Sequence, residues 1–156
     1  MKPATPRDKA HPEPASMPTR VLVVDDESLI RWSVCAALAA EGFDAVSAPD
    51  PAGGRRLAAE WPPPQVVLFD ARSPDRDAPD LLSAIRKVSP DCRFIIMTTA
   101  RHYALRCSSA DGVELIHKPF DVAQVVRLVT ELTARGISVG PRPGAGGHTG
   151  PPTSTV

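Results

Sequence analysis

Five polar residues of this chain each come at the end of a short apolar run, and together they could handle a phosphoryl group and a cation. Asp25 and Asp26 follow one run, Asp70 follows a second, Thr98 ends a third, and Lys118 comes after a fourth. Carboxylates act as nucleophiles and as ligands for Mg²⁺, which prefers oxygen. A hydroxyl and an ammonium group can bind phosphoryl oxygens. These residue types therefore predict phosphoryl transfer to a carboxylate beside a divalent cation.

The chemistry of each side chain suggests its role. Asp70 is the predicted nucleophile. Asp26 and Asp70 are the predicted direct ligands of Mg²⁺, and Asp25 is expected close by. Lys118 would neutralise one phosphoryl oxygen, and the Thr98 hydroxyl would bond to another. Clustered carboxylates repel one another unless a cation lies between them, which favours a metal site over an empty acidic patch.

The four apolar runs have the length and composition of buried parallel strands. Strands are expected at 20–24, 43–48, 66–69, 93–98 and 113–116. Helices are expected at about 28–40, 51–60, 79–88 and 121–135, with a polar loop at 71–77 and at most a short helix at 102–109. In open α/β sheets, the ligand crevice lies outside the carboxyl ends of the strands, so the five polar residues should meet at one edge.

Composition divides the chain into a core and two tails. The segment 1–19 holds five prolines, and 136–156 is rich in glycine and proline, so both are predicted to be disordered. The core, 20–135, fits a single domain. The 18 basic and 18 acidic residues balance, so a nucleic-acid or membrane surface is not expected. Without an apolar signal segment, and with three scattered cysteines, the predicted location is the cytoplasm.

The segments that hold the polar residues read VLVVDDE (21–27), VVLFDARSPD (66–75), FIIMT (94–98) and HKPF (117–120). In this order they resemble the receiver domain of two-component response regulators, over about residues 20–135. The stretch LIRWS (29–33) is similar to the receivers of enhancer-binding transcription activators. The resemblance implies a flavodoxin-like α/β fold: a doubly wound, five-stranded parallel sheet with strand order 2-1-3-4-5.

The resemblance also implies a function. Asp70 would accept a phosphoryl group from a sensor histidine kinase or a phosphotransfer protein, with Mg²⁺ as cofactor and no enzymatic turnover beyond its own dephosphorylation. The implied metal-binding groups are Asp25, Asp26, Asp70 and the backbone carbonyl of Arg72; Thr98 is the implied switch hydroxyl and Lys118 the family's lysine. Because 136–156 is too short for an output domain, we expect a stand-alone receiver that signals through contacts with an unknown downstream protein.

Three positions depart from the family's pattern and keep an alternative open. Leu115 stands where an aromatic residue is usual, Ala78 stands where glycine is usual, and Thr99 replaces a small residue or could itself be the switch hydroxyl. These departures favour a degenerate receiver that binds proteins independently of phosphorylation. A phosphatase of the haloacid-dehalogenase type also uses a strand-end Asp, but it needs a second Asp where this chain has Arg72.

The aromatic and histidine residues suggest no further site. Trp32 and Trp61 are predicted to pack in the core, and His117, next to Lys118, is expected at the surface. Pro119 makes a cis peptide bond after Lys118 plausible, and such a bond would aim the lysine inward.

Overall fold

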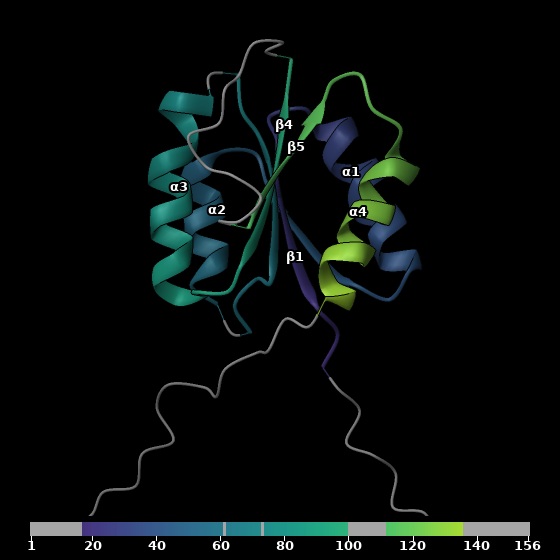
Figure 1. Ribbon diagram of the computed structural model, residues 1–156, viewed down its shortest axis with the longest axis horizontal. Helices are drawn as coiled ribbons and strands as arrows, with labels where there is room; N and C mark the ends of the chain where they lie inside the picture. Colours follow the sequence, from purple (N-terminus) through teal and green to yellow (C-terminus); the bar gives the residue numbers. More distant parts are fainter. Residues whose placement is uncertain (1–16, 61, 73, 100–111, 136–156) are drawn as a thin grey trace, which may run out of the picture.

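The computed structural model is a parallel sheet covered by helices on both faces (Figure 1). It describes residues 17–60, 62–72, 74–99 and 112–135, with the backbone alone for 74–77. The strands are β1 (Arg20–Val24), β2 (Asp44–Ala48), β3 (Val66–Asp70), β4 (Arg93–Thr98) and β5 (Val113–His117). All neighbouring strands are parallel and their order is β2-β1-β3-β4-β5. The predicted fold class and strand order are confirmed.

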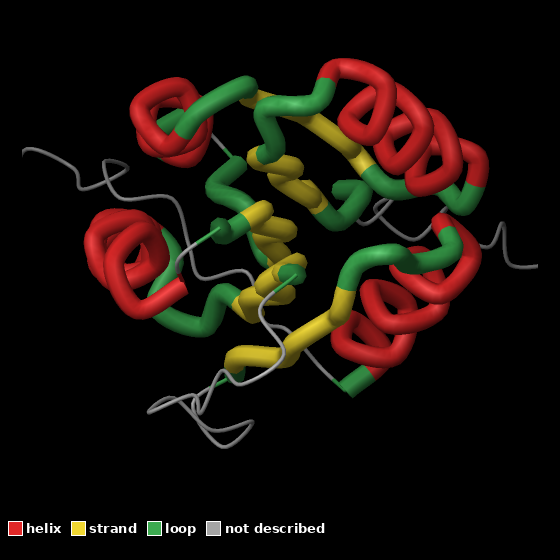
Figure 2. Tube along the Cα trace, turned by 90° about the horizontal axis from the view of Figure 1, so that it is seen from above, coloured by secondary structure: helices red, strands yellow, loops and turns green. Residues whose placement is uncertain are grey.

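Two pairs of helices cover the sheet. The helices α1 (Ser28–Ala40) and α4 (Val122–Ala134) lie on one face, and α2 (Pro51–Ala58) and α3 (Pro74–Val88) lie on the other (Figure 2). Successive strand residues point to opposite faces, so Leu22 and Val24 of β1 pack toward α2 and α3, while Val21 and Val23 pack toward α1 and α4. No helix in the described part of the chain is both long and apolar enough to cross a bilayer.

The helix ends follow local capping rules. Asp121 is the N-cap of α4, and its side chain accepts a hydrogen bond of 3.0 Å from the Ala123 N–H. Asp50 caps α2 in the same way, with a bond of 2.7 Å from the Gly53 N–H. After α1 the backbone turns at Gly42 with φ of 87°, a conformation in which a side chain would be strained.

The glycines of α2 have a packing role that their helix propensity does not suggest. Each glycine weakens a helix by about 1 kcal/mol relative to alanine. Gly53 and Gly54 are buried, and a Cβ on Gly54 would lie only 2.8 Å from Cγ2 of Val24 in β1. Gly54 therefore allows α2 to lie directly against β1.

The third helix begins earlier than predicted. It starts at Pro74, so most of the expected loop at 71–77 is helical and Pro79 lies inside the helix. Proline suits a first helical position, and the buried residues Leu81 and Ile85 hold the helix against the sheet. Ala78 is buried on this helix, and no described residue other than glycine has a positive φ. The substitution of glycine by alanine at this position therefore brings no backbone strain.

One predicted core residue is at the surface. The side chain of Trp32 on α1 is 70% exposed, whereas the buried residues of that helix are Val34 and Leu38. Trp32 is two residues before Val34, and a spacing of two places residues on opposite sides of a helix. The prediction that Trp32 packs in the core is wrong. The predictions for Trp61, for the segment 102–109 and for most of both tails fall outside the described residues.

Candidate functional site

The predicted site lies at the carboxyl edge of the sheet, where the central strands end side by side. Val24, the last residue of β1, pairs with Phe69 of β3. Asp25 and Asp70 come directly after these paired residues, so they lie on adjacent strands at the same edge of the sheet. Thr98, the last residue of β4, pairs with His117, and Lys118 comes next. The backbone N–H of Lys118 donates to the Thr98 carbonyl over 2.9 Å. The peptide bond between Lys118 and Pro119 is cis.

The three carboxylates meet as predicted. One oxygen from each of Asp25, Asp26 and Asp70 lies within 4.8 Å of the others, and the three side chains are respectively buried, exposed and half-buried. The Lys118 Nζ lies 3.1 Å from Oδ1 of Asp70 and 3.3 Å from Oδ2 of Asp25. The structure thus brings together four of the residues predicted from the strand ends.

Backbone hydrogen bonds hold Asp25 in place. Its N–H donates to the Ala48 carbonyl over 3.2 Å, and its own carbonyl accepts a bond of 2.7 Å from Nη1 of Arg31. Its Oδ1 accepts a further bond of 2.8 Å from the Glu27 N–H. With these partners the Asp25 carboxylate is fixed against β1 and β2, with Oδ2 directed at Lys118.

Thr98 and Thr99 differ in burial. Thr98 is fully buried at the end of β4, whereas Thr99 is exposed and lines an apolar hollow together with Lys118, Pro119 and Ile30. The strand register places Thr98 one position beyond Met97, the residue that pairs with Asp70. Its position at the same edge agrees with the predicted role of its hydroxyl, which stays a prediction.

Two contacts of the site were not predicted from the sequence. The Arg72 side chain forms an ion pair with Oδ2 of Asp26, whereas the sequence predicts a role only for the Arg72 backbone carbonyl. Glu27 lies with Oε1 3.7 Å from Nζ of Lys118 and adds a fourth acidic group. The position of Glu27 directly after the acidic pair was a signal for its proximity. The sequence separation of 46 residues gave no such signal for Arg72 and Asp26.

Leu115 and His117 belong to β5, the strand that pairs with β4. Leu115 is partly buried and packs against the residues shared by the sheet, α2 and α3, so an aliphatic side chain fills this position. His117 is exposed, as predicted.

Burial and neighbouring charges shift the pKa values of Asp70 and Lys118. Burial raises the pKa of Asp70; Lys118 lowers it, and the negative charges of Asp25 and Asp26 raise it, so that the net change is upward. Burial alone would lower the pKa of Lys118, but its contacts with Asp70 and Asp25 outweigh burial and raise it. The pKa of Asp70 is therefore raised mainly because its carboxylate is partly removed from water.

We expect Asp70→Asn to raise the free energy of unfolding at neutral pH by roughly 0.5–2 kcal/mol, the size of other single favourable changes. The folded state disfavours the ionised Asp70, so ionisation costs stability above its raised pKa and nothing well below its usual value of 3.8, where both states hold the proton. The stability gap should therefore open as the pH rises from 3.8 through the raised pKa. Urea unfolding of both proteins in EDTA at a series of pH values measures this difference in the free energy of unfolding. Equal stability of the two proteins at neutral pH would contradict the raised pKa of Asp70.

The donor set suits a small, hard cation. Three carboxylates offer oxygen ligands alone, which is the preference of Mg²⁺, and Mg²⁺ keeps several waters and needs few protein ligands. The described residues offer no such group that contains cysteine or histidine. The chemistry of these residues therefore fits Mg²⁺ better than zinc.

Comparison with known protein families identifies the family to which the chain belongs. The sequence profile of the response regulator receiver domain matches residues 21–130 of this chain. The chain belongs to the response regulator receiver family. This assignment confirms the resemblance inferred from the four sequence segments, and all of the site residues lie within the matched range.

Individual relatives agree with the assignment. The probable transcriptional regulatory protein TcrX of Mycobacterium tuberculosis is 32% identical over 120 residues, which cover 76% of this chain and 51% of TcrX. The DNA-binding transcriptional regulator NtrC of Salmonella typhimurium is 36% identical over 112 residues, 70% of this chain and 24% of NtrC. The chain therefore spans between a quarter and about half of these two relatives.

Solved structures give the same answer. A response regulator receiver domain from Clostridium thermocellum matches with a TM-score of 0.61 and 26% identity, over 75% of this chain and 95% of the other. A two-component transcriptional regulator AraC from Clostridium phytofermentans matches with a TM-score of 0.60 and 30% identity, over 73% and 90% of the two chains. Receiver domains of this family accept phosphoryl groups and typically bind Mg²⁺ at an acidic pocket.

Proposed function

We propose that this receiver accepts a phosphoryl group on Asp70 from a sensor histidine kinase or a phosphotransfer protein, and that it signals through protein contacts. The observation that carries the proposal is the position of Lys118, which lies between the Asp70 and Asp25 carboxylates at 3.1 and 3.3 Å. A phosphoryl group on Asp70 would therefore have an ammonium group within bonding reach.

The transfer itself is a displacement at phosphorus. A carboxylate oxygen of Asp70 attacks the phosphorus of a phosphohistidine, the bond from phosphorus to the donor nitrogen breaks, and its electron pair stays with the imidazole. Lys118 stabilises the charge that gathers on one phosphoryl oxygen, and the Thr98 hydroxyl binds another. Attack by water on the acyl phosphate later releases phosphate and restores Asp70.

The cation would be held by Asp25, Asp26 and Asp70, together with the backbone carbonyl of Arg72. Bound there, Mg²⁺ supplies positive charge to the phosphoryl oxygens and to the crowded carboxylates. The raised pKa of Asp70 agrees with this proposal, because burial disfavours the ionised carboxylate and a bound cation would favour it.

The remaining parts of the proposal concern output and location. The balanced charge, 18 basic against 18 acidic residues, supports a protein rather than a nucleic acid as the downstream partner. The same balance fits a protein that acts away from membranes, in the cytoplasm. We propose that the chain 1–156 is sufficient for phosphorylation.

The alternative of a phosphorylation-independent binding module has less support. One of its three reasons, Ala78, causes no strain in α3. Leu115 and Thr99 remain, and both bear on the response to phosphorylation rather than on the acceptor itself. The cluster of Asp25, Asp26, Asp70 and Lys118 is complete, which favours the phosphorylated receiver.

Metal removal tests this function. We expect acetyl phosphate with MgCl₂ to add one phosphoryl group to the chain, seen by intact-protein mass spectrometry. EDTA should slow labelling by roughly 10²-fold or more, because several kcal/mol of charge stabilisation is lost. Restoring MgCl₂ in excess is the control. A chain that takes no label in MgCl₂ would favour the binding-module alternative.

A further inference from the structure

Among the described residues, two side-chain cations contact the carboxylates of the acidic cluster, and each contacts different ones. Lys118 contacts Asp70 and Asp25, at 3.1 and 3.3 Å. Arg72 contacts the third carboxylate, that of Asp26. Each of the three carboxylates that could hold a cation is therefore already paired with a positive side chain of the protein itself.

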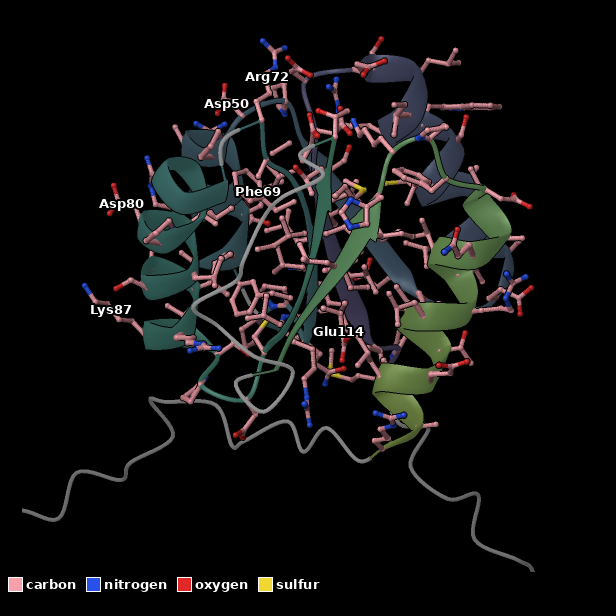
Figure 3. The ribbon with its side chains drawn as sticks, turned by 45° about the horizontal axis from the view of Figure 1, so that its top comes forward. Asp50, Phe69, Arg72, Asp80, Lys87 and Glu114 are labelled. Atoms are coloured by element: carbon pink, nitrogen blue, oxygen red, sulfur yellow. The ribbon has the colours of Figure 1, made fainter. Side chains whose placement is uncertain are left out.

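The two cations are held very differently. The Lys118 side chain is 14% exposed and contacts the fully buried carboxylate of Asp25. The Arg72 side chain is 80% exposed, and its partner Asp26 is 50% exposed. Figure 3 shows Arg72 at the upper edge of the molecule, the edge that carries the site. Ion pairs in such exposed positions are weak and exchange readily, so Arg72 is the cation that can be displaced.

The backbone next to Arg72 is fixed, although its side chain is exposed. Asp70 is the last residue of β3, and Ala71 is fully buried and donates its N–H to the Met97 carbonyl over 2.9 Å. Arg72 therefore begins at a defined point beside the site, and its long side chain reaches Asp26 from there. The contact joins the residue two positions after the proposed acceptor to one of the proposed metal ligands.

We propose that the Arg72 guanidinium competes with the divalent cation for Asp26 and thereby raises the Mg²⁺ concentration that the site needs. An Asp26 oxygen that accepts from the guanidinium is less available as a metal ligand. A guanidinium in that position also repels a cation among carboxylate oxygens that lie within 4.8 Å of one another. Both effects act in the same direction. The inference rests on the proposed cation site, but not on phosphoryl transfer.

Titration of the full chain with MgCl₂ by isothermal calorimetry, at constant ionic strength and without a phosphodonor, tests the competition. We expect Arg72→Gln to lower the Kd for Mg²⁺ about two- to fivefold, which matches the strength of an exposed ion pair. The control is Lys87→Gln, which removes one positive charge from the exposed last turn of α3, far from Arg72 in Figure 3. Its Kd should equal that of the parent.

The possible results distinguish failure of the competition from failure of the proposed cation site. An unchanged or higher Kd in Arg72→Gln, with normal binding by the parent, would overturn the competition and leave the cation site intact. Equal tightening in Lys87→Gln would assign the effect to net charge and also overturn it. If neither the parent nor the variant binds Mg²⁺, the proposed cation site itself fails. Circular dichroism confirms that the variants are folded.

Discussion

Asp70→Asn is expected to take no phosphoryl group from acetyl phosphate in MgCl₂. An amide oxygen is a poor nucleophile, and loss of an attacking group commonly costs well over about 10³-fold in rate. The change preserves the shape of a side chain that lies 3.1 Å from Lys118, so the fold and the neighbouring carboxylates should remain. Intact-protein mass spectrometry over a time course measures the loss.

The matched control for this variant is Asp80→Asn. Asp80 is exposed on α3 and lies apart from Arg72 in Figure 3, so the same chemical change is made away from the site. We expect Asp80→Asn to label at the rate of the parent. Labelling of Asp70→Asn at the parent's rate would show that another residue is the acceptor.

Lys118→Ala has the second-largest expected effect, and it acts on both stability and labelling. Removal of the ammonium leaves the fully buried Asp25 carboxylate without its ion pair and Asp70 without its closest positive charge. Because loss of one partner of a buried pair leaves an uncompensated charge, we expect a loss of about 1–3 kcal/mol in EDTA. Labelling in MgCl₂ should slow about 10²-fold, the usual cost of one donor to a developing charge.

Urea unfolding and the labelling time course measure these two effects. The control is Lys87→Ala, which removes an exposed lysine from the last turn of α3. It should change neither the stability nor the labelling rate. The part of the stability loss that comes from Asp70 should shrink as the pH falls through the raised pKa of Asp70, because the protonated side chain no longer needs the ammonium. A Lys118→Ala protein as stable as the parent at neutral pH, with the parent's labelling rate, would place the ammonium outside the working site.

The fold and the main residues of the site could be predicted because both depend on short-range patterns. Buried parallel strands are continuous apolar runs, so their ends are visible in the sequence, and the polar residues at those ends share one edge of the sheet. Asp25, Asp70 and Lys118 follow strands β1, β3 and β5 in this way, or end them. Their convergence required only the strand direction, which all five strands share.

The features that could not be predicted depend on side-chain direction and on helix boundaries. Arg72 and Asp26 are far apart in the sequence, and long side chains at a rim can take several partners. The start of α3 was placed too late because Pro79 can begin a helix, whereas Pro74 does so here. Trp32 does not pack in the core, because the face of α1 defined by Val34 and Leu38 leaves it exposed.

In the proposed function, Asp70 carries the phosphoryl group. Reduction of the phosphorylated chain with borohydride converts an aspartyl phosphate into homoserine, and peptide mass spectrometry then locates the change. We predict homoserine at position 70 alone, in a peptide that contains the end of β3. Homoserine at position 25 or 26, with Asp70 unmodified, would show that Asp70 is not the phosphoacceptor.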